Sequence, residues 1–99
     1  MRIEWHPLAR FDLLEIVAYI AEDSEEAAFR LRDEIDRQIS LLAYTPEMGR
    51  PGRRRETREL VIAGTAYIAV YRVAERRVII LRILHGARRW PKRFAAPQD

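Results

Sequence analysis

Three β-rich runs follow one another in the second half of the chain with very short links between them. The runs span residues 57–63, 67–73 and 78–84, and the links are residues 64–66 and 74–77. A parallel connection needs a crossover of a dozen or more residues, whereas links of this length suit hairpins. The three runs are therefore predicted to form an antiparallel meander, which restricts the chain to folds built on a small antiparallel sheet.

The first half of the chain predicts one short strand and two helices. Residues 2–5 alternate between polar and apolar side chains, which indicates a strand. Pro7 suits the first turn of a helix, and Asp23 and Ser24 are typical of the start of another. The first helix is predicted from about Pro7 to Ala21, and the second from just after Ser24 to near Tyr44. Their apolar stripes comprise Leu13, Ile16, Val17 and Ile20, and then Ala28, Leu31, Ile35, Ile39 and Leu42.

These elements predict an α+β domain with the order strand–helix–helix–strand–strand–strand. The helix hairpin is expected to pack on one face of a small, mainly antiparallel sheet, and the opposite face is expected to be partly open. Residues 46–55 contain two prolines, two glycines and four arginines, which predicts a loop. The length of 99 residues fits a single domain, which we place at residues 1–94, with a flexible tail at residues 95–99.

The composition argues against several classes of protein. The chain has no cysteine, so disulfides and thiolate metal sites are excluded. Its two histidines lie far apart in the sequence, and we expect neither a metal nor another cofactor. No apolar run is long enough to span a membrane, and the start lacks a signal-peptide apolar region, so we expect a cytoplasmic protein with no membrane partner.

Charge is distributed unevenly along the chain. Residues 1–47 hold 11 acids and 5 bases, a balance of −6, whereas residues 48–99 hold 4 acids and 13 bases, a balance of +9. This asymmetry points to an anionic partner for the second half, with attraction between the two halves as the alternative. Of the 18 basic residues, 17 are arginine, whose planar guanidinium suits phosphate and carboxylate.

The third β-rich run ends in a cationic cluster. Arg82 interrupts its apolar sequence, so this side chain must face water or meet an anion. By strand alternation Arg82 is expected on the same side as Ile80 and Leu84, with its guanidinium on a carboxylate such as Glu59. His85 follows the run, and Arg88, Arg89 and Trp90 come directly after it.

Two interpretations of this cluster remain open from the residues alone. Cleavage of RNA without a metal needs a base, an acid and cations around the phosphate. In this interpretation His85 serves as the acid or base, and positive charge comes from Arg58, Arg72, Arg82, Arg88 and Arg89. In the structural alternative, His85 and Trp90 close the edge of the sheet, and Arg58 pairs with Glu59 or Glu75.

Four segments together resemble the RelE/ParE toxins of bacterial type II toxin–antitoxin systems. They are Pro46-Glu-Met-Gly-Arg50, Thr57-Arg-Glu-Leu-Val-Ile62, Tyr67-Ile-Ala-Val-Tyr-Arg-Val73 and Ile80-Leu-Arg-Ile-Leu-His-Gly-Ala-Arg-Arg-Trp90. The first helix also resembles the family, through Ala9, Asp12, Leu13, Ile16, Tyr19 and Ile20. The resemblance covers nearly the whole chain, and the family fold agrees with the predicted order of elements.

The resemblance implies one of two targets. ParE-like members inhibit DNA gyrase, whereas RelE-like members enter the ribosome and cut mRNA. Arg-Glu-Leu-Val-Ile and Leu-His-Gly-Ala-Arg are closer to ParE, and the chain departs from the nucleases in three ways. Residues 67–69 contain no base before Arg72, residues 57–63 offer only Arg58, and Phe94 replaces a C-terminal tyrosine. Arg88 and His85 do match nuclease residues.

We therefore expect a non-enzymatic gyrase inhibitor that is neutralised by an antitoxin in a hetero-oligomer. The alternative is a ribosome-dependent endoribonuclease that uses His85 and Arg88 for catalysis, and a third interpretation is a member that retains only antitoxin binding. Target binding is assigned to Arg58, Arg72, Arg82, Arg88, Arg89 and Trp90. Antitoxin binding is assigned to Leu13, Val17, Ile20, Leu31 and Ile35.

Overall fold

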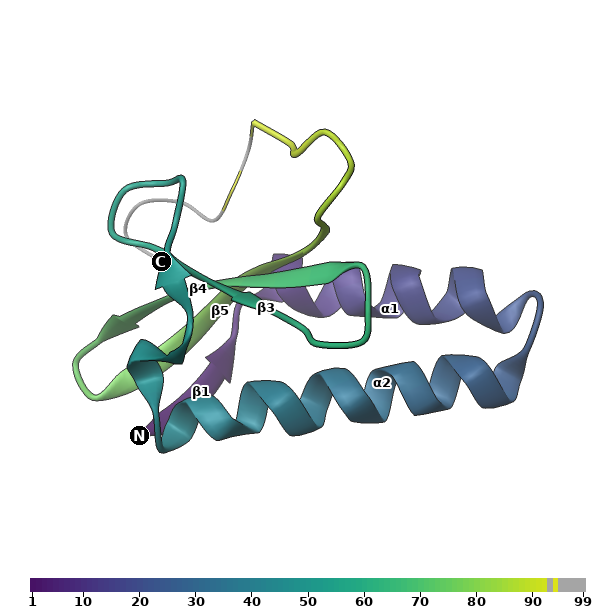
Figure 1. Ribbon diagram of the computed structural model, residues 1–99, viewed down its shortest axis with the longest axis horizontal. Helices are drawn as coiled ribbons and strands as arrows, with labels where there is room; N and C mark the ends of the chain where they lie inside the picture. The colour runs from purple at the N-terminus through teal and green to yellow at the C-terminus, as the bar shows by residue number, and fades with distance from the viewer. Residues whose placement is uncertain (93, 95–99) are drawn as a thin grey trace.

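The computed structural model describes residues 1–92 and residue 94, and it has two layers (Figure 1). Helices α1 (Pro7–Ala21) and α2 (Glu25–Ser40) form a hairpin against one face of a five-stranded sheet. The strands are β1 (Arg2–Trp5), β2 (Arg50–Pro51), β3 (Arg58–Val61), β4 (Tyr67–Ala74) and β5 (Arg77–His85), in the order β1-β5-β4-β3-β2. The predicted α+β class and order of elements are confirmed. The predicted tail at residues 95–99 lies outside the described residues.

Side chains fix the start of each helix. His6 precedes Pro7, and its Nδ1 accepts a hydrogen bond of 3.1 Å from the backbone N–H of Leu8. Ser24 caps α2 through a 3.1 Å bond that its Oγ accepts from the backbone N–H of Ala27. After Ser40 the chain tightens into two short 3₁₀ turns, η1 (Leu41–Ala43) and η2 (Pro46–Met48). These bonds satisfy backbone donors that a helix end leaves free.

The sheet confirms the predicted meander and adds two pairings. Strands β3, β4 and β5 are antiparallel neighbours, as the short links required. Strand β1 pairs in parallel with β5, and the helix hairpin supplies the long crossover that a parallel pair needs. Strand β2 lies inside the segment that we expected to be a loop, and it pairs with residues 58–59 of β3. Two residues are too short a run for strand periodicity to detect.

The expectation that Ile80 and Leu84 share a side of β5 is wrong. Val70 pairs with Arg82 but Tyr71 pairs with Ile80, so β5 carries one extra residue at Leu81. Such a bulge reverses the alternation of side chains beyond it. Ile80 accordingly lies in the core beneath the helices, whereas Leu84 lies in a second cluster.

The second apolar cluster lies on the sheet face away from the helices. Ile68, Val70 and Leu84 form it, and Trp90 and Phe94 pack against it. The expected partly open face agrees with the structure, because Val61 of β3 lies on the same face and is 49% exposed, while Trp90 and Phe94 cover the cluster itself. Within the described residues, this face of the sheet is therefore covered in part by side chains that follow β5.

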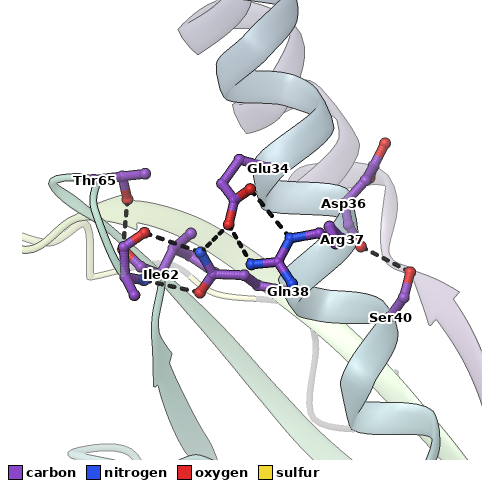
Figure 2. Close-up of polar contacts among 8 residues, drawn as sticks. Glu34, Asp36, Arg37, Gln38, Ser40, Ile62 and Thr65 are labelled. Carbon is purple, nitrogen blue, oxygen red and sulfur yellow. Dashed lines mark hydrogen bonds and ion pairs between the residues drawn. The ribbon is translucent and has the colours of Figure 1, made fainter.

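A polar network attaches α2 to the turn between β3 and β4 (Figure 2). The side-chain amide of Gln38 donates to the carbonyl of Ala63 at 2.9 Å and accepts from its N–H at 2.8 Å. The same amide donates to Glu34, which also pairs with Arg37 at 2.6 Å. Gln38 is only 8% exposed, so both of its polar groups need partners and find them.

Within the described residues, no helix is long and apolar enough to cross a bilayer.

Candidate functional site

The chain turns sharply at the end of β5, and His85 stands at this corner. Its Nδ1 accepts a 3.1 Å hydrogen bond from the backbone N–H of Ala87, and its ring meets the Tyr67 ring edge-on at 5.5 Å. Its carbonyl accepts from the indole Nε1 of Trp90 at 3.1 Å and from the N–H of Arg88 at 3.2 Å. Because Nδ1 is an acceptor, the proton of the neutral imidazole resides on Nε2.

A groove of about 400 Å³ lies between the His85 corner and helix α1. One wall carries Asp12, Glu15 and Tyr19 from α1, and the other carries His85, Arg88 and Arg89; Ile16, Tyr67, Ile83, Leu84 and Trp90 complete the lining. Arg88 and Arg89 are exposed at its rim. Of the predicted site residues, the structure therefore brings together His85, Arg88, Arg89 and Trp90.

Arg82 pairs with Asp12 of α1, which confirms the predicted carboxylate partner, although the example that we named, Glu59, is wrong. Its Nε and Nη2 donate to the Asp12 carboxylate at 2.7 and 2.9 Å, and the backbone N–H of Ile83 donates to the same carboxylate at 3.0 Å. Strand β1 pairs only as far as Ile80, so Asp12 satisfies an N–H at an edge of β5 that no strand covers. Both side chains are nearly buried, and this arginine joins the two layers.

Arg58 is the first residue of β3, and Arg72 lies in the half of β4 that is away from His85. Arg58 donates to the carbonyls of Gly49 at 2.9 Å and Glu47 at 3.1 Å, instead of pairing with Glu59 or Glu75. It lines a separate groove of about 450 Å³ with Arg72. Arg72 is five positions along β4 from Tyr67, the residue opposite His85, a distance of about 16 Å at 3.3 Å per residue. The six residues predicted to bind the target thus do not form one site.

Arginines of the loop at residues 46–55 contact the residues that follow β5. The Arg53 guanidinium lies 3.6 Å from the centre of the Trp90 ring, and that of Arg54 lies 4.2 Å from the Phe94 ring. Arg54 also donates to the carbonyls of Pro91 at 3.1 Å and Lys92 at 2.9 Å. We define the basic surface as Arg53, Arg54, Arg55, Arg88, Arg89 and Lys92, all of them exposed.

The sequence did not lead us to assign Arg53, Arg54, Arg55 or Lys92 to the site. The run of arginines between Gly52 and the next strand was the available signal, but two segments so far apart in the chain cannot be paired from periodicity. Within residues 1–92 and Phe94, no three His, Asp or Glu side chains are grouped to hold a metal ion.

Helix α1 presents apolar side chains to solvent as well as to the core. Phe11 is 57% exposed, Leu14 68% and Tyr19 66%. Of the residues predicted to bind the antitoxin, Ile35 is fully buried, Leu13 and Leu31 pack partly against the core, and Val17 and Ile20 are half-buried. The exposed apolar side chains of α1 are therefore more accessible than the predicted set. Large apolar side chains left exposed together mark interaction sites in many proteins.

Comparison with known proteins gives one consistent result. Residues 3–90 match the model of the family described as ParE toxin of type II toxin-antitoxin system, parDE. The chain is 44% identical over 91 residues to Y4kP of Sinorhizobium fredii strain NBRC 101917 / NGR234, which is named as a candidate toxin. That alignment covers 92% of this chain and 94% of the relative.

A solved structure agrees with this relationship. A chain from the chromosomal ParDE TA system of P. aeruginosa superposes with a TM-score of 0.77 and 27% sequence identity, covering 86% of this chain and 95% of that one. The family match extends from β1 through the His85 corner to Trp90, so it includes both layers of the fold and the candidate groove. The protein belongs to the ParE toxin family of type II toxin–antitoxin systems.

Proposed function

We propose that this toxin acts in the bacterial cytoplasm by binding and inhibiting DNA gyrase, without catalysing a reaction of its own. The observation that carries the proposal is the engagement of Arg82 by Asp12 at 2.7 Å. A nuclease would need several cations around the phosphate that the 2′-hydroxyl of the RNA attacks while His85 transfers the proton. Arg82 is committed to a structural pair, and Arg58 and Arg72 line a different groove, which leaves His85 with Arg88 and Arg89. An exposed cationic rim suits binding better than phosphate chemistry.

A ribosome-dependent endoribonuclease is the second candidate. It is favoured by one observation, namely that His85 and Arg88 line the same groove. In this candidate His85 would transfer the proton and Arg88 would stabilise charge on the phosphate. The third candidate, a toxin that retains only antitoxin binding, predicts neither activity.

One experiment separates the three candidates. Purified toxin is added to a gyrase supercoiling assay, and in parallel to a translation reaction whose mRNA is mapped by primer extension. We expect loss of supercoiling, accumulation of cleaved DNA and intact mRNA. Codon-dependent mRNA cuts with normal supercoiling would establish the nuclease, and activity in neither assay would leave antitoxin binding alone.

We also propose that the cognate antitoxin silences the toxin in a hetero-oligomer and docks on α1. The exposed side chains of Phe11, Leu14 and Tyr19 support this surface, because an amphipathic partner helix can bury them. Leu14→Glu should then abolish co-purification with the antitoxin encoded beside the toxin. Leu41→Glu, at a residue that is 43% exposed on η1, is the matched control and should still co-purify.

A further inference from the structure

The basic surface is a single unit although it comes from two segments. Arg53 stacks on Trp90 at 3.6 Å, and Arg54 bonds the carbonyls of Pro91 and Lys92. Figure 1 shows the loop around residues 50–56 and residues 86–92 on the same side of the sheet. The two groups of cations are therefore held together before any partner arrives.

A buried carboxylate holds the loop in position. Glu59 of β3 is 2% exposed, and it accepts bonds from Nη2 of Arg50 at 3.1 Å and from the backbone N–H of Arg53 at 2.8 Å. The loop also closes through Gly52, whose N–H donates to the carbonyl of Thr57 at 2.8 Å, and a Cβ on Gly52 would collide with the Thr57 side chain. Because the loop is already ordered, binding through it would lose little conformational entropy.

The chemistry of the surface selects among anionic partners. Residues 50–55 and 85–92 contain seven bases and no acid. None of the large apolar side chains that are exposed elsewhere in the described chain lies in either stretch. Protein interfaces depend on apolar and aromatic anchors at their centre, whereas contacts to a phosphate backbone need only cations and hydrogen-bond donors. Arginine also matches phosphate geometry with its planar fork.

We propose that the basic surface binds the phosphate backbone of duplex DNA, and that Glu59 positions it to do so. The choice of DNA rests on the proposed function, since a gyrase inhibitor acts where the enzyme holds duplex DNA. In this arrangement the toxin contacts the enzyme and its nucleic acid together. The apolar face of α1 stays available to a protein partner.

Binding is measured with the purified full-length toxin and a short labelled duplex of random sequence, by fluorescence anisotropy over a salt series. The test variant is Arg55→Gln/Arg88→Gln/Arg89→Gln, and the matched control is Arg10→Gln/Arg30→Gln/Arg32→Gln, which removes the same charge from the helices. Each phosphate contact contributes about 0.9 to the slope of log K against log salt, so the test variant should lose about 2–3 units of slope. The control should keep the wild-type slope. Equal slopes in the two variants would overturn the proposal.

Glu59→Gln tests whether DNA binding depends on the position of the loop or only on attraction between opposite charges. This change makes the protein more positive, so unspecific attraction would strengthen binding, whereas a loosened loop should weaken binding at least severalfold. Thermal unfolding verifies that the variant is folded, and the surface triple variant tests the proposal independently if it is not. Tighter or unchanged DNA binding by a folded Glu59→Gln variant would contradict the proposal that Glu59 positions the basic surface.

The identity of the polyanion is tested by competition. Unlabelled duplex DNA should displace the labelled duplex far more effectively than poly-glutamate or single-stranded RNA does. Equal or better displacement by either competitor would overturn the assignment to DNA. If the toxin inhibits gyrase but does not bind duplex DNA in the absence of gyrase, this inference is refuted and the proposed function stands. If the toxin binds DNA but does not inhibit gyrase, the proposed function is refuted and the DNA-binding surface stands.

Discussion

Asp12 of α1 and Arg82 of β5 lie 70 positions apart in the chain and form a two-pronged ion pair between the layers, at 2.7 and 2.9 Å. The carboxylate also accepts the N–H of Ile83 at 3.0 Å, so one aspartate neutralises a nearly buried cation and satisfies an uncovered strand edge. The pair connects the helix hairpin to the strand that ends at His85.

Arg82→Leu should destabilise the fold by about 1–3 kcal/mol, because a nearly buried carboxylate loses its charged partner. Urea unfolding followed by circular dichroism measures this change. Arg77→Leu is the control, since Arg77 pairs with Glu4 in a more exposed ion pair, for which about 0–1 kcal/mol is expected. Equal losses of unfolding free energy in the two variants would contradict the larger contribution expected of the Asp12–Arg82 pair.

The fold could be predicted from the sequence wherever one local rule decided the outcome. Strand β1 and helix α1 have the predicted bounds because alternation, Pro7 and an apolar stripe all agree there. The meander followed from link lengths that allow no other connection. These features depend on neighbours in sequence, and local patterns report such neighbours well.

The site was predicted less well because it depends on contacts between distant residues. Alternation placed Arg82 on the same side as Ile80, but the bulge at Leu81 reversed the faces, and no local sequence pattern indicates that bulge. Arg82 could then reach Asp12, which lies outside the apolar stripe of the first helix. His85, Arg88 and Arg89 were found together because they are adjacent in the chain.

Tyr71 carries a second buried polar contact whose loss should be measurable. The residue is fully buried, and its hydroxyl donates to the carbonyl of Pro46 at 2.7 Å and accepts from the N–H of Gly49 at 2.9 Å. Tyr71→Phe leaves both backbone groups without this partner and should cost about 1–3 kcal/mol of unfolding free energy. Tyr44→Phe, at a side chain that is 87% exposed, should change stability little. A stable Tyr71→Phe variant would contradict the assigned role of this hydroxyl.

Substitutions in the turn between β4 and β5 should stabilise the protein. Glu75 and Arg76 have φ angles of 52° and 62°, which side chains with a Cβ disfavour and which Asn-Gly adopts readily in hairpins. Glu75→Asn/Arg76→Gly should stabilise the protein by about 1 kcal/mol and raise Tm by about 4–8 °C. Glu75→Ala/Arg76→Ala keeps the Cβ atoms and should bring no gain. If the Ala pair stabilises as much as Asn-Gly, strain in the turn is not the cause.

Glu34 should give the stability a pH dependence in acid. Hydrogen bonds from Arg37, and then from Gln38, lower the pKa of this carboxyl from 4.5 to about 2 (Figure 2). Since the pKa is depressed in the folded state, the stabilisation is complete above pH 4.5 and is lost as the pH falls from 4.5 towards 2. Glu34→Gln should therefore flatten the stability profile in that window. Glu26→Gln, from an exposed pair on the same helix, is the matched control, and an identical change in both would contradict the prediction.

His85→Gln decides between the two mechanisms. The Nδ1 of His85 accepts the N–H of Ala87 at 3.1 Å, and the glutamine side-chain oxygen can accept in its place, but glutamine does not titrate near neutral pH. A gyrase inhibitor should therefore keep most of its toxicity, whereas a nuclease should lose about 10²–10⁴-fold in rate. Inhibition of purified gyrase, growth arrest and primer extension on mRNA give the readouts, with circular dichroism to verify the fold.

The double variant Arg88→Gln/Arg89→Gln is the companion to this test. It should impair either mechanism, because both need the cationic rim of the groove, so it verifies the site while His85→Gln identifies the chemistry. Growth arrest with intact mRNA and a tolerated His85→Gln supports the gyrase inhibitor. A folded His85→Gln variant without toxicity, together with codon-dependent mRNA cuts by the wild type, would reverse the assignment, since only proton transfer requires a titrating group at this corner.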